Sequence, residues 1–547
     1  MRSSASTRGS FTAFVAVAIG LWLPATSEAT HFRYGLYAST PTGPMSMEFR
    51  LQNGFRRDGY FCLSPTLNTV RCRASDGYPG VGDLFVETIG GTRLMFGDGT
   101  SVGSQRGPLM FVVTAIDMAQ NWLFALAIDP DSLPAIRTAI PHTYPTTGTF
   151  VAYTDSCCRI SRIDDGVYSH INNPDGGYRV QATVTVGDGN TPPISALPPI
   201  MICPYPATCT FQIPAADSDG DPITFRLATP PEASSFSAST CPTTFCQPGD
   251  PGSGSPNPAT VSPSGLYSWN TSDATLGPSD TVTLYSTQVV ISDSDRNGNT
   301  KSSIGLDFLL ALVPCPPAGC VPPVFPPPPR GIPPVCYATV PISVGGTLTF
   351  SVQAADANVD DAVLLNGIGL PRGAVMTPAL PASGNPVTAN FTWRPSAADI
   401  GTIVINFTAT SADGTALCPV TVNVLPNTPP SVRCEAGPNP AARVPAASPS
   451  ANEDGFYRLI GSDLEDGAVS VFVTNANGTT TFGPFASGTV LKITEAPGTM
   501  SFRAPIGGPG SSVVAHVVLD SDALIYAVDS GGLLSPKTVC TVAPPPK

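Results

Sequence analysis

The stretch that decides the fold is Ile213–Thr229, which reads IPAADSDGDPITFRLAT. Its first half is an Asp- and Gly-rich segment of the kind that forms turns. Three aspartates surround Gly220 there: Asp217, Asp219 and Asp221. Its second half alternates apolar and polar residues, the period of a half-buried β-strand. We therefore expect an acidic turn that enters a strand with three residues facing a core: Ile223, Phe225 and Leu227.

Weaker copies of this pattern follow along the chain. AAD returns at 354–356, and GSDLEDGAVSVFV at 461–473 again places acidic residues before a strand. The phrase NTPP occurs at 190–193 and 427–430 and marks two boundaries. Spacings of roughly 90–120 residues fit a string of sandwich domains rather than a solenoid of short repeats. Many Gly and Pro (52 and 61 of 547 residues) and few charged residues (12%) also favour short strands and turns.

The sequence divides into a leader, four units and a linker. Arg2 and Arg8 precede the apolar stretch 11–25, and small residues before position 30 predict a signal peptide over 1–29. The first unit is 30–195 and the second is 196–314. The segment 315–335 is rich in proline and predicts an extended spacer that sets the distance between the two halves. The third unit is 336–426 and the fourth is 427–547.

Two motifs of the first unit carry a resemblance to a known family. FGDG (96–99) and HTYPTTGTFVAY (142–153) resemble the polycystic kidney disease (PKD) domain, which implies an Ig-like β-sandwich. The second unit resembles the dystroglycan-type cadherin-like and putative Ig families, through its acidic turn and the strand GLYSWN (265–270). The third unit resembles the putative Ig family, and the fourth is Ig/PKD-like. The expected fold is all-β, with tandem Ig-like or cadherin-like sandwiches.

Fourteen cysteines in an exported chain favour disulfides over metal thiolates. Their placement suggests six pairs: Cys62–Cys72, Cys203–Cys209, Cys241–Cys246, Cys315–Cys320, Cys336–Cys418 and Cys434–Cys540. Connectivity does not follow from sequence, and Cys203–Cys315 is a rival pair. Cys157 and Cys158 either bridge each other or each pair elsewhere.

The acidic turn is a candidate calcium site. Ca²⁺ takes six to eight oxygen ligands, and closely spaced aspartates on a turn supply several. The candidate ligands are Asp217, Asp219, Asp221, Asp293 and Asp295. The cadherin-like resemblance implies that such residues stiffen a domain junction with Ca²⁺. The alternative is a solvated Asp/Gly turn without metal.

The sequence offers little to an enzyme. GTSVG (99–103) matches a Gly-x-Ser-x-Gly motif, but the helix that such a nucleophile needs is not indicated after it. The four histidines form no metal-binding pattern. We therefore expect no catalytic residues and no cofactor apart from calcium.

These observations predict an exported, non-enzymatic protein, secreted or held at a cell surface. The resemblance to Ig-like and cadherin-like families implies that it serves in adhesion or binding. Its partner would be a protein or glycan at a cell surface or in a matrix. A formal charge of −13 argues against nucleic acid or anionic lipid as the main partner. No stretch after the signal peptide predicts a transmembrane span. One alternative is a hydrolase-associated or carbohydrate-binding protein with its site in 30–195. Another is a structural stalk or matrix component.

Overall fold

A computed structural model describes residues 32–540 apart from internal gaps. The gaps are 59, 87–91, 103–108, 119–120, 164–165, 237–239, 317–318, 328–334, 437–455, 464–468, 477, 496–500, 504–513, 520–522 and 530–532. The signal peptide expected over 1–29 lies outside the described residues. Among the described residues, no helix is long and apolar enough to cross a bilayer.

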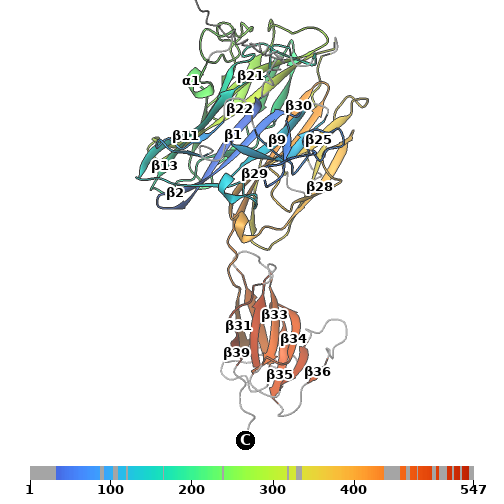
Figure 1. The fold of residues 1–547 in the computed structure, drawn as a ribbon. Coiled ribbons are helices and arrows are strands. Elements are labelled where there is room, and N and C mark those ends of the chain that lie inside the picture. Colours follow the sequence, from blue (N-terminus) through green and yellow to red (C-terminus); the bar gives the residue numbers. More distant parts are fainter. Residues whose placement is uncertain are drawn as a thin grey trace, which may run out of the picture.

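The chain is all-β, as the sequence predicts, and it forms tandem β-sandwich domains (Figure 1). The first unit contributes fourteen strands and a 3-10 helix at Pro130–Ser132. The strands are β1 (Phe32–Gly43), β2 (Ser46–Arg56), β3 (Cys62–Leu63), β4 (Thr69–Val70), β5 (Leu84–Val86), β6 (Leu94–Met95), β7 (Ser101–Val102), β8 (Met110–Asp117), β9 (Trp122–Ile128), β10 (Ile140–Thr143), β11 (Gly148–Cys157), β12 (Tyr168–His170), β13 (Gly177–Val186) and β14 (Ile194–Ser195).

The second unit adds eight strands and a single-turn helix, α1 (Pro230–Ala233). The strands are β15 (Ile200–Tyr205), β16 (Thr208–Gln212), β17 (Ala215–Ala216), β18 (Ile223–Leu227), β19 (Thr260–Val261), β20 (Leu266–Asn270), β21 (Val282–Ser294) and β22 (Thr300–Pro314). Strand β18 is the strand expected from the opening stretch. Its Phe225 is buried, Ile223 and Leu227 pack partly against the same core, and the residues between them are exposed.

One sheet runs through the first and second units. The long strand β22 pairs with its hairpin partner β21 and also with β1 and β13 of the first unit. Strand β12 runs parallel to β21, with Tyr168 opposite Val282. Aromatic and aliphatic residues from both units share one core. The first two units therefore form one fused body.

The third unit is a sandwich of a five-stranded and a three-stranded sheet. Its strands are β23 (Ala338–Ser343), β24 (Leu348–Ala354), β25 (Val363–Ile368), β26 (Val375–Thr377), β27 (Ala382–Gly384), β28 (Val387–Trp393), β29 (Gly401–Ser411) and β30 (Gly414–Leu425). A 3-10 helix at Ala397–Asp399 precedes β29. Trp393 is buried between the sheets, and Trp269 is buried in the same way in the fused body. Both tryptophans pack in cores, so neither is a sugar-stacking platform.

The third unit packs directly on the fused body. The buried Asn406 of β29 donates through Nδ2 to the carbonyl of Ala196 at 2.9 Å, and Val404 and Leu417 join the core of the fused body. Asn406 stands in an N-x-[ST] sequence, and its burial closes it to glycosylation.

The proline-rich segment differs from the expected free spacer. Its Val324 exchanges two backbone hydrogen bonds with Ala355, at 2.8 and 2.9 Å. The backbone amide of Val321 donates to Asp413 at 3.1 Å. The described part of the segment therefore lies along the third unit. Because the fused body and the third unit touch each other directly, the segment does not set their separation.

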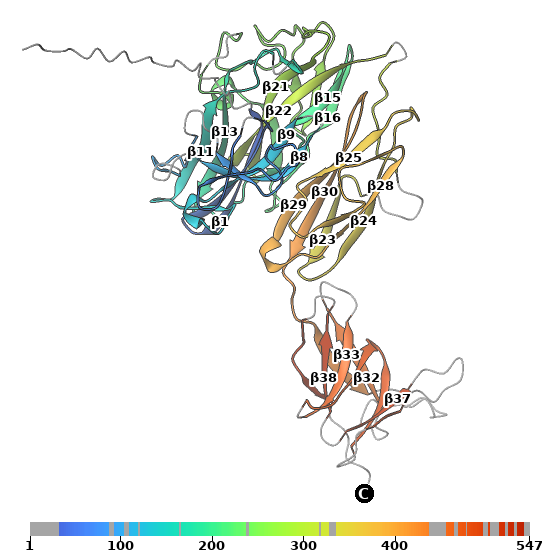
Figure 2. The ribbon, with the colours of Figure 1, turned by 45° about the vertical axis from the view of Figure 1, so that its right-hand side comes forward.

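The fourth unit lies apart from the others in both views (Figures 1 and 2). It contains two sheets around a small core. Its strands are β31 (Ser431–Ala436), β32 (Phe456–Ser462), β33 (Ser470–Asn475), β34 (Thr481–Ala486), β35 (Val490–Glu495), β36 (Ser501–Arg503), β37 (Val514–Leu519), β38 (Ala523–Val528) and β39 (Thr538–Cys540).

All fourteen cysteines are paired. The pairs are Cys62–Cys72, Cys157–Cys158, Cys203–Cys209, Cys241–Cys246, Cys315–Cys320, Cys336–Cys418 and Cys434–Cys540. The structure thus selects the vicinal bridge at 157–158 and does not form the rival pair of Cys203 with Cys315.

Candidate cation site at the edge of the second unit

The acidic turn before β18 gathers three carboxylates. Asp217, Asp219 and Asp221 each offer an oxygen atom, and these atoms lie within 4.8 Å of one another. The turn holds itself together, because Oδ1 of Asp217 accepts the backbone amides of Asp219 at 2.9 Å and Asp221 at 3.1 Å. This is the closed Asp/Gly turn that the sequence pattern favours.

The boundary phrase NTPP packs against this turn. The side-chain amide of Asn190 donates to Oδ2 of Asp293, the buried aspartate near the end of β21, at 2.7 Å. The next residue, Thr191, donates its backbone amide to Asp219 at 2.6 Å. Two adjacent residues of the junction thus contact two of the predicted ligands. The sequence analysis used NTPP only as a boundary and missed Asn190 as a site residue.

Two oxygen atoms at this edge are buried without a hydrogen-bond partner. They are Oδ2 of Asp217 and Oδ1 of Asn190, a residue that is 3% exposed. Leaving a buried acceptor unsatisfied costs about 1–3 kcal/mol, so such atoms are rare and usually have a function or an unseen partner. Oxygen atoms of carboxylates and amides are the ligands that Ca²⁺ prefers. These residues therefore fit a hard cation.

The charge balance at the turn agrees with this fit. Burial raises the pKa of Asp217 above its ordinary value, and the carboxylates of Asp293 and Asp219 raise it further. Hydrogen bonds from the backbone of Asp221 and Asp219 offset part of this rise. Crowded carboxylates repel one another, and a divalent cation among them would remove that repulsion.

Lys301 supplies a positive charge at the same place. Its Nζ lies 2.5 Å from Oδ2 of Asp221, and this hydrogen bond, working against partial desolvation, raises the pKa of Lys301. The side chain of Lys301 is 27% exposed and flexible enough to move. Lys301 thus neutralises one of the three clustered carboxylates and would compete with a cation for it.

The remaining predicted ligands are placed differently. Asp293 is fully buried, and its oxygens accept from Ser302 and Asn190. Asp295 lies in the turn between β21 and β22, where its oxygens accept from Asn297 and Asn299. The structure therefore brings Asp217, Asp219 and Asp221 together, puts Asp293 beside them as a support, and leaves Asp295 in the hairpin turn.

The contact between the asparagine of NTPP and a strand-end aspartate recurs at the entry to the fourth unit. The amide of Asn427, from the second NTPP phrase, donates to Asp529 just after β38 at 2.8 Å. Oδ1 of Asn427 is again buried without a hydrogen-bond partner. Of the acidic residues that we singled out in this unit, Asp463 is described, whereas Glu465 and Asp466 lie outside the described residues.

The motifs that carry the PKD resemblance form a structural contact. His142 lies 2.8 Å from Asp98 and stacks on the ring of Phe96, and the hydroxyl of Tyr144 donates to the carbonyl of Phe96 at 3.1 Å. Burial alone would raise the pKa of Asp98, but hydrogen bonds from Thr100 and His142 hold it below its ordinary value. The two motifs thus fasten β10 to the turn that follows β6.

Ser101 of the Gly-x-Ser-x-Gly sequence is no nucleophile elbow. It lies in the two-residue strand β7, paired with β6. A serine–histidine contact that the sequence did not reveal joins Nε2 of His170 to Oγ of Ser286 at 3.1 Å. Both side chains are fully buried, so a substrate has no access to them. Burial lowers the pKa of His170 to about 4, which keeps it neutral.

Two grooves lie outside the first unit. One, of about 950 Å³, runs between β23 and β24 of the third unit, and its described lining contains no Asp, Glu, His, Lys or Arg. The other, of about 550 Å³, lies where the second unit, the proline-rich segment and the third unit meet. Neither offers the converging acid and base groups that hydrolysis needs.

One protein family matches part of the chain. The family described as "Integrin beta-like protein A-E, N-terminal" matches residues 33–187. This span begins in β1 and ends directly after β13, so it covers the strands of the first unit up to the NTPP junction. A comparison with curated proteins gave no match.

Solved structures give only distant similarity. A titin structure of domains I67–I69 is 9% identical, covers 64% of this chain and 98% of its own, with a TM-score of 0.17. The sialic acid binding region of a Streptococcus sanguinis adhesin is 14% identical, covers 44% and 80%, with a TM-score of 0.15. An endo-fucoidan hydrolase is 12% identical, covers 62% and 39%, with a TM-score of 0.15. Scores this low support no argument about function.

Proposed function

We propose that this chain is an extracellular, non-enzymatic binding protein of the adhesion type, with Ca²⁺ supporting the edge of its second unit. The family match over 33–187 and seven disulfides favour an extracellular binding protein. The observation that carries the calcium part is the buried, unpartnered oxygen of Asp217 among three clustered carboxylates. A second unpartnered oxygen belongs to Asn190, whose amide donates to Asp293.

Asp217, Asp219 and the amide oxygen of Asn190 would hold the ion, and Asp221 would join them when Lys301 moves away. A bound Ca²⁺ supplies a fixed double positive charge that links NTPP to the acidic turn. Because NTPP leads out of the first unit, the ion would stiffen the path between the matched domain and the second unit. Asp293 would keep Asn190 in position through its hydrogen bond.

The test is calorimetric titration of the full chain with CaCl₂ after removal of divalent ions. We expect saturable binding that D217N weakens by at least roughly tenfold, because it removes one charged ligand. D360N, at an exposed aspartate in the third unit, is the matched control and should bind as the unaltered chain does. Equal binding by all three proteins would overturn the assignment.

The structural-stalk alternative shares the sandwich domains but needs no binding surface. Binding of a soluble protein or glycan by the first two units would separate the adhesion proposal from it. The hydrolase alternative would have its site in residues 30–195, where Ser101 lies in the short strand β7. Alanine at Ser101 or His170 should leave any hydrolase activity of the preparation unchanged.

A further inference from the structure

A disulfide loop in the first unit exposes an unusual number of apolar side chains. We define the disulfide loop as residues 61–83, which contain β3 and β4. Every residue from Pro65 to Arg73 is exposed except Cys72, so the loop protrudes. Five large apolar residues on it face solvent: Phe61 (67% exposed), Leu67 (50%), Val70 (41%), Tyr78 (43%) and Val81 (55%). Single exposed apolar residues are ordinary, but such a group marks an interaction site.

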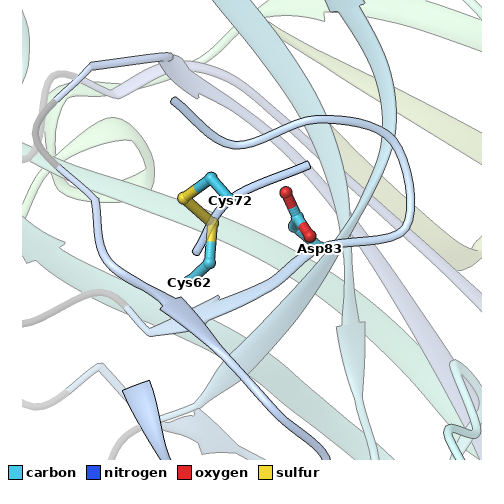
Figure 3. Close-up of side chains that lie close together, drawn as sticks. All are labelled: Cys62, Cys72 and Asp83. Carbon is cyan, nitrogen blue, oxygen red and sulfur yellow. A yellow bond between two sulfur atoms is a disulfide. The ribbon is translucent and has the colours of Figure 1, made fainter. Parts of the chain in front are cut away.

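A disulfide and hydrogen bonds to Asp83 hold the base of the loop, and Figure 3 shows Cys62, Cys72 and Asp83 side by side. Cys62 and Cys72 are bridged, and the buried Asp83 beside them accepts the backbone amides of Arg73 at 2.7 Å and Gly80 at 3.0 Å. Asp83 and the two sulfurs lie close together, but cysteines in a disulfide have no thiolate to offer a metal. Arg57, which is 3% exposed, donates to the carbonyl of Pro79 at 3.2 Å.

These anchors mean that the exposed side chains are presented in a fixed arrangement. Arg57 also donates to Asp76 at 2.7 Å. Asp76 is the one acidic residue between 61 and 82. A preorganised surface loses little conformational entropy when it binds. A bridge, a buried arginine and a buried aspartate thus support a loop that contributes few side chains to the core.

The charged residues of the disulfide loop are two arginines and two aspartates, so the loop is neutral within a chain of formal charge −13. Arg73 pairs with Asp83 at 3.3 Å and Asp76 pairs with the buried Arg57, whereas Arg71 is exposed on the hairpin. Cys62 pairs with Val70 across the hairpin, so Phe61 and Arg71 flank this pair as neighbours. At the surface of a bilayer, an exposed aromatic ring can enter the apolar layer while a neighbouring arginine keeps its charge among the negative headgroups.

We infer that the disulfide loop docks on the surface of an anionic phospholipid bilayer, with its apolar side chains inserted and Arg71 among the headgroups. The loop exposes fourteen residues, fewer than the roughly 20–30 residues that a stable protein interface uses on each side. Inserted apolar side chains and basic residues at the headgroups together account for such binding. The acidic remainder of the chain would face away from the lipid.

Docking of the disulfide loop would give an exported chain a way to stay at a surface that needs no membrane-spanning helix. It also limits the expectation, drawn from net charge, that anionic lipid is not the main partner. Local charge, rather than total charge, decides contacts within a Debye length of about 8–10 Å.

The test uses the full chain and sedimentation with vesicles of phosphatidylcholine alone or mixed with phosphatidylglycerol, in the presence of a chelator. The chelator removes any contribution of the proposed calcium site. We expect binding to the mixed vesicles that falls as salt rises. F61S/V81S should lower partition by roughly tenfold or more, and R71Q by roughly fivefold on the mixed vesicles alone.

The matched control is V359S in the third unit, where Val359 is 81% exposed. It removes an apolar side chain that is more exposed than Phe61 or Val81 and should leave vesicle binding unchanged. Failure of the unaltered chain to bind mixed vesicles would overturn the inference. Equal loss with V359S would also overturn it, as would self-association without vesicles that F61S/V81S abolishes. Circular dichroism spectra must show that each variant is folded.

Discussion

The residues that hold the fused body together are buried and polar, and His170 is one of them. Burial lowers the pKa of His170 to about 4, from an ordinary value of 6.5. Between these two pH values the unfolded chain binds a proton that the folded chain does not bind. The contribution of His170 to the free energy of unfolding is therefore fully present above about pH 6.5. It falls by roughly 3 kcal/mol in total as the pH drops toward 4.

The measurement is the free energy of unfolding of the fused body from pH 7 to pH 4, in the unaltered chain and in H170Q. Carboxylates also titrate near pH 4, so the difference between the two curves is the informative quantity. We expect H170Q to lose less stability across this range. Parallel curves would show that His170 does not contribute the pH dependence.

Arg159 and Asp307 form a second buried polar contact in the fused body. Two charged groups meet in a forked pair, with Nη1 of Arg159 2.8 Å from Oδ1 of Asp307, and both residues are buried. Arg159 also donates to the carbonyl of Ala233 at 3.1 Å. We expect R159M to destabilise the fused body by about 3–5 kcal/mol, because it leaves the Asp307 carboxylate buried and unpaired.

Calorimetric melting of the full chain checks this expectation. The double variant R159M/D307L should regain most of the lost stability, since no buried charge remains. The matched control is R226M, which breaks the exposed pair of Arg226 with Glu232 and should cost less than about 1 kcal/mol. A loss in R159M no larger than in R226M would contradict the account.

Sequence patterns predicted some of these residues and not others. Alternation predicted that Phe225 faces a core, and it is buried there. The partner of Arg159 is 148 residues away in the sequence, so no local pattern could show it. Asn190 was visible as part of a repeated phrase, and its recurrence as Asn427 was the signal for a site residue.

At the scale of elements, β22 is the strand on which the first two units depend. It pairs with β1 at Leu36 and Gly35 and with β13 at Ala182 and Thr183. We expect a fragment of residues 30–195 not to fold alone, because β1 and β13 lose this partner and Arg159 loses Asp307. A fragment of residues 30–314 should unfold cooperatively on heating.

Thermal melting followed by near-ultraviolet circular dichroism tests both fragments. Cooperative unfolding of the 30–195 fragment would contradict the shared sheet. From the sequence, residue 195 was expected to be a boundary between two units. Composition and turn residues mark the NTPP junction, whereas pairing between strands more than a hundred residues apart leaves no mark in a single sequence.

The whole molecule combines a fused body, a third unit packed against it and a fourth unit apart from both. The fourth unit has its own core, and Cys434–Cys540 closes a sequence separation of 106 residues. We expect residues 427–547 to fold alone, and C434S/C540S to lose about 4–5 kcal/mol in the chain-entropy account of disulfides. Urea unfolding of the isolated unit measures this, and a loss below about 1 kcal/mol would contradict it.

A bound Ca²⁺ would connect single residues to the arrangement of whole units, because it would stiffen the junction between the first and second units. Sequence spacing found the three aspartates of the turn. It did not show that Lys301 faces Asp221 or that Asn190 carries an unpartnered oxygen, because both depend on how distant segments pack. Removal of the Lys301 side chain should free the Asp221 carboxylate to bind Ca²⁺, and this gives a specific test of the calcium site.

The most direct measurement is therefore the thermal midpoint of the fused body in the full chain, with Ca²⁺ and with a chelator, for three proteins. Ca²⁺ should raise the thermal midpoint of the unaltered chain. At a free Ca²⁺ concentration of a hundred times the dissociation constant, the free energy of unfolding should rise by about 2.7 kcal/mol. K301Q should reach its higher midpoint at lower Ca²⁺, and D217N should show little change. An unaltered chain whose midpoint is the same with Ca²⁺ and with chelator would contradict the calcium account.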